Sequence, residues 1–316
     1  MLQWTFEKLA ENGVDEVILA VNKLTEFHIK QQRIPRHGLT VKFSIDPPKM
    51  PLGTAGPVKK AERLIGHDEP FLVLNGDLIT EINYRQLFKS HSEEAIATIA
   101  LHKAEDPSRY GVAELSEDGH IKRFIEKPPK GTEPSKLINA GVYVLSPKIF
   151  EYIPVGRAVS MEREVFPKLA LESKLYGQEV TGLWIDIGKP EEYLETNKIL
   201  LNSIICKKHN HEMFELRNPV AIEKGVTIGE NSIVGPYAVL GKNVTIGKNV
   251  QISDSVIFAD AKIDDDSVIC GALIGEAARI GKRTKISDGC IIADHAKVKD
   301  GASLHEKVSV CPAKEI

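Results

Sequence analysis

The sequence lacks the features that would indicate a membrane protein, a secreted protein or a nucleic-acid-binding protein. No apolar run is long enough to span a membrane, and the N-terminus shows no signal-peptide pattern. The formal net charge of the 316 residues is -3, so no overall field favours nucleic acid or an anionic membrane. We therefore expect neither nucleic acid nor a membrane as a partner.

Cysteine is scarce and widely spaced. Cys206, Cys270, Cys290 and Cys311 form no C-x-x-C pair, so neither a zinc site nor a disulfide framework is indicated. A reducing cytoplasm is the simplest location for such a chain. Apolar residues make up 42% of the sequence and charged residues 27%, which is typical of a soluble globular protein with a substantial core.

The first two-thirds of the chain alternates strand and helix patterns. Apolar runs at 17–21, 71–77 and 95–101 predict buried strands, and helices are predicted at 84–91, 161–172 and 189–204. Asp118-Gly119 lies between two strand-like runs and predicts a hairpin turn. This alternation predicts a three-layer α/β domain with a mostly parallel sheet.

The last third follows a six-residue repeat instead. Large aliphatic residues recur at this spacing from residue 222 to 252 and again from 274 to 310, with slips near residues 257 and 268. Four positions after each of them, except the last, stands a small or β-branched residue, of which Cys290 is one. A period of six fits neither an amphipathic helix nor a hairpin, but it fits a coil with three short faces per turn. It predicts a left-handed parallel β-helix.

Five short segments appear in a fixed order before this repeat. They are PLGTAGP (51–57), LNGD (74–77), RYGV leading to FIEKP (109–128), NAGVYVLSP (139–147) and WIDIGKPEEYL (184–194). In this order, and followed by a β-helix, they resemble the sugar-1-phosphate nucleotidyltransferases. The resemblance covers nearly the whole chain and is closest to mannose-1-phosphate guanylyltransferases, whose MEREVFPKLA-like helix (161–170) the chain also contains.

The resemblance implies a Rossmann-like nucleotidyltransferase domain at residues 1–206, a linker at 207–218 and the β-helix domain at 219–316. It also implies an enzyme that joins a nucleoside triphosphate to a sugar 1-phosphate and releases pyrophosphate. GTP and mannose 1-phosphate are the favoured substrates, and GDP-mannose the product. UTP or dTTP with glucose 1-phosphate stays open as an alternative.

The nucleotide is expected at the loop that contains Leu52, Gly53 and Thr54, together with Gly76. This loop carries little side-chain bulk, so a flat base could lie against its backbone, and in the resembling family it contacts the nucleobase. The alternative is an ordinary turn before a helix at 58–64.

Two carboxylates, Asp77 and Asp186, resemble the family's Mg²⁺ ligands. Asp77 ends an apolar strand, where a buried carboxylate is costly unless it holds a cation or accepts several hydrogen bonds. Two carboxylates and substrate phosphates suit Mg²⁺, which seldom has an all-protein cage. A turn or helix cap is the alternative for each, and Gly188 and Pro190 make it a real one for Asp186.

The sugar phosphate is expected at a second group of residues. By resemblance, Glu126 accepts hydrogen bonds from sugar hydroxyls and Lys127 meets the phosphate as a catalytic cation. Asn139, Gly141 and Gly111 match positions that meet the sugar, and glycine allows close backbone approach. A surface salt bridge is the alternative for Glu126 and Lys127.

Members of this family begin with a strand and a glycine-rich loop, Gly-x-Gly-x-Arg-Leu followed by Pro-Lys, which wraps the triphosphate. This sequence contains no such segment, so the chain as given could be inactive, and two strand edges should lack a partner. Three explanations stay open: a start assigned too late in a longer enzyme, a truncated or split product, and a non-catalytic regulatory subunit that binds nucleotide sugar. The first is favoured, because the metal and sugar positions match the family pattern.

The β-helix leaves two questions of function. Its exposed strand edges or apolar rows are expected to join subunits into a homo-oligomer or a hetero-oligomer. His295 and His305 could serve an acetyltransferase, but solvated turn histidines are the favoured interpretation, because the β-helix is short.

Overall fold

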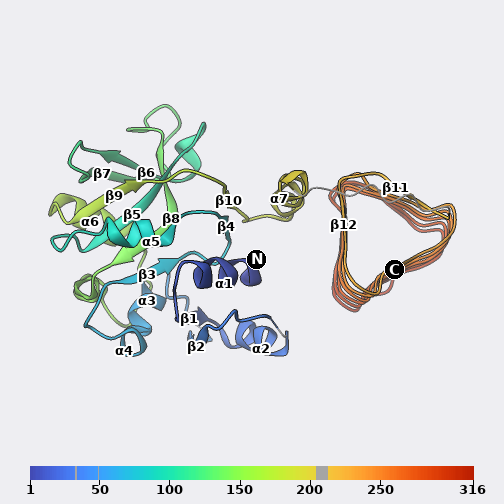
Figure 1. The fold of residues 1–316 in the computed structure, drawn as a ribbon, viewed down its shortest axis with the longest axis horizontal. Helices are drawn as coiled ribbons and strands as arrows, with labels where there is room; N and C mark the ends of the chain where they lie inside the picture. Colours follow the sequence, from blue (N-terminus) through green and yellow to red (C-terminus); the bar gives the residue numbers. More distant parts are fainter. Residues whose placement is uncertain (33, 49, 204–212) are drawn as a thin grey trace. The chain divides into compact units, whose positions relative to one another are not determined.

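The computed structural model describes residues 1–32, 34–48, 50–203 and 213–316. It divides into two compact units, Met1–Asp186 and Ile187–Ile316, each of which is described by itself (Figure 1). Residues 207–212 of the predicted linker lie outside the described residues, and β11 (Glu215–Leu216) already belongs to the β-helix. Among the described helices, none combines the length and the apolar character that a membrane crossing needs.

The first unit is an α/β domain. Its elements are α1 (Leu2–Glu11), β1 (Glu16–Val21), α2 (Lys23–Gln31), β2 (Thr40–Ile45), α3 (Gly56–Lys60), α4 (Glu62–Ile65), β3 (Phe71–Leu74), β4 (Leu78–Thr80), α5 (Tyr84–Lys89), β5 (Ala97–Lys103), η1 (Pro107–Arg109), β6 (Gly111–Leu115), β7 (Ile121–Glu126), β8 (Leu137–Leu145), η2 (Pro147–Tyr152), η3 (Met161–Val165), α6 (Phe166–Leu171), β9 (Leu175–Glu179) and β10 (Trp184–Asp186). The predicted α/β class and the predicted hairpin turn between β6 and β7 are confirmed.

The long strand β8 organises the main sheet. It pairs antiparallel with β3, β5 and β6, whereas β5 pairs parallel with β9 and β6 pairs antiparallel with β7. It follows that β3, β5, β6 and β9 run in one direction and only β7 and β8 run against them. The sheet is therefore mostly parallel in strand direction, with an antiparallel strand at its centre.

Two apolar layers cover the faces of this sheet. One contains Phe166 and Leu169 of α6 against Ile99 and Tyr143, and the other contains Phe6 of α1 with residues of β3 and β8. Alternate residues of a strand point to opposite faces, so β5 and β8 supply both layers. The sheet is thus the middle layer of the unit, and the loops at its strand ends can form a binding site.

The strands β1 and β2 form a separate parallel pair. Within the described ranges, β1 pairs only with β2, and β3 pairs only with β8, so each has one edge without a strand partner. This agrees with the two unpaired edges expected from the sequence. Side chains of β1 and β3 nevertheless belong to one apolar cluster with α1.

The predicted helix at 161–172 is interrupted. Residues Met161–Val165 form a π-helical turn, and α6 begins only at Phe166. Pro167 has no backbone N–H to donate to an earlier carbonyl, which explains why regular α-helical bonding does not run through this segment.

The second unit contains α7 (Pro190–Ser203) and a parallel β-helix of about five turns. Its strands are β11 (Glu215–Leu216), β12 (Val220–Ile222), β13 (Thr227–Ile228), β14 (Ile233–Val234), β15 (Ala238–Leu240), β16 (Thr245–Ile246), β17 (Gln251–Ser253), β18 (Val256–Ile257), β19 (Lys262–Ile263), β20 (Val268–Cys270), β21 (Leu273–Ile274), β22 (Arg279–Ile280), β23 (Lys285–Ile286), β24 (Ile291–Ile292), β25 (Lys297–Val298), β26 (Ser303–Leu304) and β27 (Ser309–Val310). They form three sheets, one for each face of the triangular coil in Figure 1. The left-handed sense of the coil stays a prediction.

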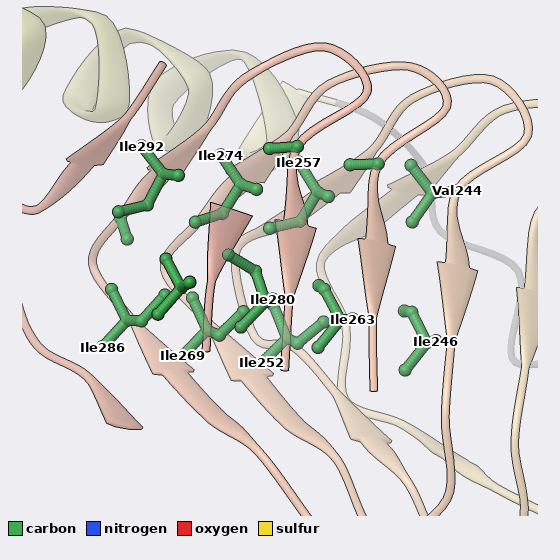
Figure 2. Packing of buried hydrophobic residues seen from close by; sticks show 14 of the residues in the cluster. Val244, Ile246, Ile252, Ile257, Ile263, Ile269, Ile274, Ile280, Ile286 and Ile292 are labelled. Carbon is green, nitrogen blue, oxygen red and sulfur yellow. The ribbon is translucent and has the colours of Figure 1, made fainter. Parts of the chain in front are cut away.

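The six-residue repeat corresponds to the inner wall of the coil. Figure 2 shows a ladder of isoleucines that point inward, and Ile246, Ile263 and Ile280 stack in register on one face. The small position Cys290 is fully buried, as predicted. His295 and His305 are exposed, which agrees with solvated turn residues. Ile222, in the first coil, is the exception because it is 39% exposed.

Candidate active site

The two predicted metal ligands meet across a pair of short strands. β10 pairs antiparallel with β4, and Asp186 lies directly opposite Leu78, the residue that follows Asp77. Segments more than a hundred residues apart in sequence therefore bring two carboxylates to one strand end. Asp77 is exposed and Asp186 is half-buried, so the expected cost of burying Asp77 is not present. The turn Asn75-Gly76-Asp77 separates it from the buried sheet.

Gly141 gives β8 the shape that this strand end needs. It has a φ of 69°, and a Cβ there would lie 2.8 Å from the Asn75 side-chain nitrogen. The Asn75 backbone N–H donates to the Gly141 carbonyl (2.9 Å), and the Gly141 N–H donates to Asn139 Oδ1 (2.9 Å). A side chain at position 141 would have to displace the side chains of Asn75 and Leu78, and its residue would have to adopt a left-handed backbone conformation.

The sugar-site candidates Glu126 and Gly111 are cross-strand neighbours. They pair in register on β7 and β6, and a Cβ on Gly111 would lie 2.9 Å from Glu126 Oε2. Glu126 is half-buried, and burial raises the pKa of its carboxyl, with the nearby charge of Glu162 adding to the shift. Lys127 is exposed in a left-handed conformation (φ 49°), and its backbone N–H donates to the Tyr110 carbonyl (3.0 Å).

The predicted nucleotide loop lies against the segment before η3. The Ala55 N–H donates to the Val159 carbonyl and the Val159 N–H donates to the Leu52 carbonyl, both at 2.9 Å. Gly53 has a φ of 72°, and a Cβ there would lie 2.3 Å from the Val159 carbonyl oxygen. Only glycine fits this close approach. Gly76, by contrast, is exposed with open space where a Cβ would be.

Tyr143 connects the metal and sugar candidates. Its ring is buried, and Asn139 Nδ2 lies 3.0 Å from its hydroxyl oxygen. Burial raises the pKa of Tyr143, and the charges of Glu162, Glu126 and Asp77 add to this effect. Tyr143 therefore lies within electrostatic range of the predicted metal ligand Asp77, of the predicted sugar-site residue Glu126 and of Glu162.

An open cavity of about 310 Å³ lies beside the sugar-site candidates. It is lined by His102, Lys103, Ala104, Glu105, Asp106, Arg109, Tyr110 and Trp184. The Trp184 ring meets Tyr110 edge-on at 5.4 Å, and its Nε1 donates to the Ala140 carbonyl (2.8 Å). Tyr110 precedes the sugar-site candidate Gly111, and Trp184 stands two residues before the metal-site candidate Asp186. The two aromatic residues are therefore adjacent in sequence to both groups of site candidates.

Sequence reasoning missed Glu162 and Ser160. Both lie at the start of the π-helical turn and contact the nucleotide loop or its support. The signal in the sequence is the MEREVFPKLA-like segment, whose amphipathic pattern predicts only a helix.

The donor set fits a hard divalent cation that also has other ligands. Among the residues that the structure describes, no group of three or more His, Cys, Asp or Glu side chains could hold a metal. Two carboxylates alone suit Mg²⁺ when phosphates and water complete its octahedral shell.

Comparisons with known proteins agree with both units. Residues 1–203 match the nucleotidyl transferase family, and residues 216–316 match the GMPPB C-terminal domain. The fold and these two matches together define an α/β nucleotidyltransferase with a C-terminal β-helix. The chain belongs to the nucleotidyl transferase family.

Curated relatives narrow the comparison. A mannose-1-phosphate guanylyltransferase catalytic subunit beta from Drosophila pseudoobscura pseudoobscura is 38% identical over 229 residues, 71% of this chain and 61% of that protein. The protein of the same name from Danio rerio is 40% identical over 201 residues, 63% of this chain and 55% of that protein. The chain thus spans a little over half the length of these relatives.

Two solved structures are similar to the chain. HddC from Yersinia pseudotuberculosis is 28% identical with a TM-score of 0.53, covering 63% of this chain and 84% of that one. A second structure of HddC, complexed with GMP-PN, is 27% identical with a TM-score of 0.52 and covers 63% and 85%.

Proposed function

We propose that this protein transfers a nucleotidyl group from GTP to mannose 1-phosphate, giving GDP-mannose and pyrophosphate. The observation that carries the proposal is the pairing of Asp186 with Leu78 beside Asp77, which joins two distant motifs at one strand end of a nucleotidyl transferase domain. Its widely spaced cysteines suit a reducing cytoplasm.

The choice of guanine and mannose rests on the relatives. Both curated relatives reported above are named mannose-1-phosphate guanylyltransferases, and one similar structure is titled as a complex with GMP-PN. Glucose 1-phosphate with UTP or dTTP is the alternative pair of substrates. An oligomer formed through the β-helix is also part of the proposal.

Members of this family generally use a divalent metal such as Mg²⁺. Asp77 and Asp186 are the residues that would hold it here. When bound, the ion would neutralise charge on the substrate phosphates.

The residues of this chain position the two substrates for reaction. The backbone of Leu52, Gly53 and Thr54 holds the base, with Gly76 leaving room beside it. Glu126 accepts hydrogen bonds from sugar hydroxyls, and Lys127 holds the sugar phosphate as a compact positive charge. The phosphate oxygen of the sugar then attacks the α-phosphorus in line, and pyrophosphate leaves.

Asn139 and Gly141 shape the sugar side of the site. The amide oxygen of Asn139 is already bonded to the Gly141 N–H, and its nitrogen lies next to the Tyr143 hydroxyl. The side chain is thus fixed before the sugar binds, and that preorganisation lowers the entropic cost of orienting the two substrates.

The test is pyrophosphate release with each of GTP, UTP and dTTP against mannose 1-phosphate and glucose 1-phosphate. The proposal expects the GTP and mannose 1-phosphate pair to be fastest. Preference for UTP or dTTP with glucose 1-phosphate would overturn the choice of substrates. If no pair is turned over but GDP-mannose binds tightly, the protein is a non-catalytic subunit that binds nucleotide sugar, and the proposed enzymatic activity is wrong.

A further inference from the structure

The π-helical turn at the start of the MEREVFP segment has no role in the reaction described above. It spans Met161–Val165, and Ser160 caps it by accepting a hydrogen bond from the Arg163 N–H (3.2 Å). Single π-helical turns inside α-helices are frequent at functional sites. This turn directs the side chain of Glu162 toward the nucleotide loop rather than along the helix surface.

Glu162 is the acceptor for two hydroxyl groups. Thr54 Oγ1 donates to Glu162 Oε2 at 2.6 Å, and Ser160 Oγ donates to the same oxygen at 2.8 Å. The Thr54 hydroxyl also accepts a hydrogen bond from the Met161 N–H (2.8 Å). Its single proton is therefore donated within the protein, so Thr54 contributes to nucleotide binding through its backbone.

These bonds complete a clamp on the nucleotide loop. The backbone bonds of Val159 to Leu52 and Ala55 hold the two ends of the loop, and the Thr54–Glu162 bond holds its middle. Gly53, whose missing Cβ allows close contact with Val159, lies between these points. The backbone amides of the loop can read a base only if this arrangement persists.

Glu162 also reaches the sugar side of the site. Its charge acts on Glu126 and on Tyr143, and in both cases it adds to the effect of burial in raising the pKa. Lys127 and Arg163 oppose this effect at Glu126. Glu162 thus contacts the loop expected to hold the base and lies within electrostatic range of the carboxylate expected to hold the sugar.

We propose that Glu162 is a positioning residue, which holds the loop Leu52–Ala55 in its base-binding conformation through Thr54 and Ser160. This inference rests on the proposed function, because it assumes that the loop binds the nucleotide. It assigns to the MEREVFP segment the task of preorganising the loop before nucleotide arrives.

The experiment measures binding of GMP and of GDP-mannose by calorimetry to the full chain and four variants. Glu162→Ala removes the acceptor, Glu162→Gln keeps an acceptor oxygen without the charge, and Thr54→Val removes the donor. The fourth is the double variant Glu162→Ala with Thr54→Val. The control is Glu172→Ala. Glu172 lies at the C-terminal end of the same helical segment, and its hydrogen bonds are to Tyr152 and Lys174 rather than to the loop.

We expect Glu162→Ala and Thr54→Val each to weaken binding of both ligands about tenfold, equivalent to about 1.4 kcal/mol. The double variant should be no worse than either single variant, since all three break one clamp. Glu162→Gln and the control should stay within about twofold of the wild type.

Equal binding by wild type and Glu162→Ala, or a double variant that is additive, would overturn the inference alone. A wild-type protein that binds neither GMP nor GDP-mannose would overturn the proposed function as well. If Glu162→Ala fails to fold in a thermal-unfolding control, the near-isosteric Thr54→Val variant decides the matter: binding about tenfold weaker than the wild type supports the inference, and equal binding overturns it.

Discussion

The carboxylate of Asp186 is the single side chain on which most of the proposed chemistry depends. Replacing it by asparagine preserves size and half-burial but removes the charge expected to hold the cation. We expect Asp186→Asn to fold normally and to lose turnover by about 100-fold, since a bound metal supplies several kcal/mol of charge stabilisation. Pyrophosphate release and thermal unfolding measure the two effects. The control is Asp68→Asn, an exposed aspartate elsewhere in the domain; wild-type turnover in Asp186→Asn would refute the metal assignment.

Glu126 predicts a pH dependence of sugar-nucleotide binding. Its pKa is raised above 4.5, first by burial and then by Glu162, so the carboxyl gains its proton at a higher pH than an ordinary glutamate. The ionised form accepts hydrogen bonds on both oxygens and makes stronger ones than the protonated form, so GDP-mannose affinity should be full above the raised pKa and decrease as the pH falls through it. Calorimetry from about pH 4 to pH 8 would show this. The Glu126→Gln variant should lack the transition, and an identical profile in that variant would contradict the role.

At the residue scale, the sequence identified candidate site residues better than it predicted their burial and their contacts. Asp77 was expected in a buried strand end, yet it lies exposed beyond a turn, because the local pattern cannot tell where a strand stops pairing. The contact of Glu162 with the nucleotide loop could not be predicted, because its partner Thr54 is more than a hundred residues away in the sequence. Contacts of that separation follow from tertiary packing and leave no periodic signal in the chain.

At the scale of elements, the β-helix turns gain their stability from the inward ladder seen in Figure 2. Ile274 is fully buried in it, whereas Lys285 points outward and is exposed. We expect Ile274→Ala to destabilise the β-helix by about 2–5 kcal/mol through lost contacts and a cavity. The matched change Lys285→Ala should stay within about 0.5 kcal/mol.

The two tryptophans make this measurement specific. Trp4 and Trp184 both belong to the first unit, so their fluorescence follows that unit, whereas far-ultraviolet circular dichroism also follows the β-helix. In Ile274→Ala the dichroism transition should shift in denaturant while the tryptophan transition stays in place. An unchanged dichroism transition would mean that the ladder does not limit the stability of the coil.

The elements that the sequence predicted best were those with a strict period. The six-residue repeat located the inward positions of the β-helix, because each coil repeats the same backbone geometry and requires a large and a small side chain at fixed places. The helix at 161–172 was less well predicted: Pro167 and the clamp to the nucleotide loop produce a π-helical turn that an amphipathic pattern does not reveal.

At the scale of the whole molecule, each unit has its own core. In the part of the chain that the structure describes, β1 and β3 of the first unit each have one edge without a strand partner. Alternate amides of a strand point to opposite edges, so half of the β1 amides face away from β2. We expect these amides to exchange hydrogen much faster than those of β5, which pairs with both β8 and β9. Hydrogen exchange with residue resolution measures this. Full protection along β1 would show that its second edge has a hydrogen-bonding partner.

The central claim is that the loop Leu52–Ala55, the carboxylates Asp77 and Asp186 and the group around Glu126 form one site. A structure of the protein with GDP-mannose and Mg²⁺ tests it most directly. The account predicts guanine against the loop, mannose beside Glu126 and Asn139, and the ion about 2.1 Å from oxygens of Asp77 and Asp186. A ligand bound elsewhere, or an ion that touches neither aspartate, would contradict it.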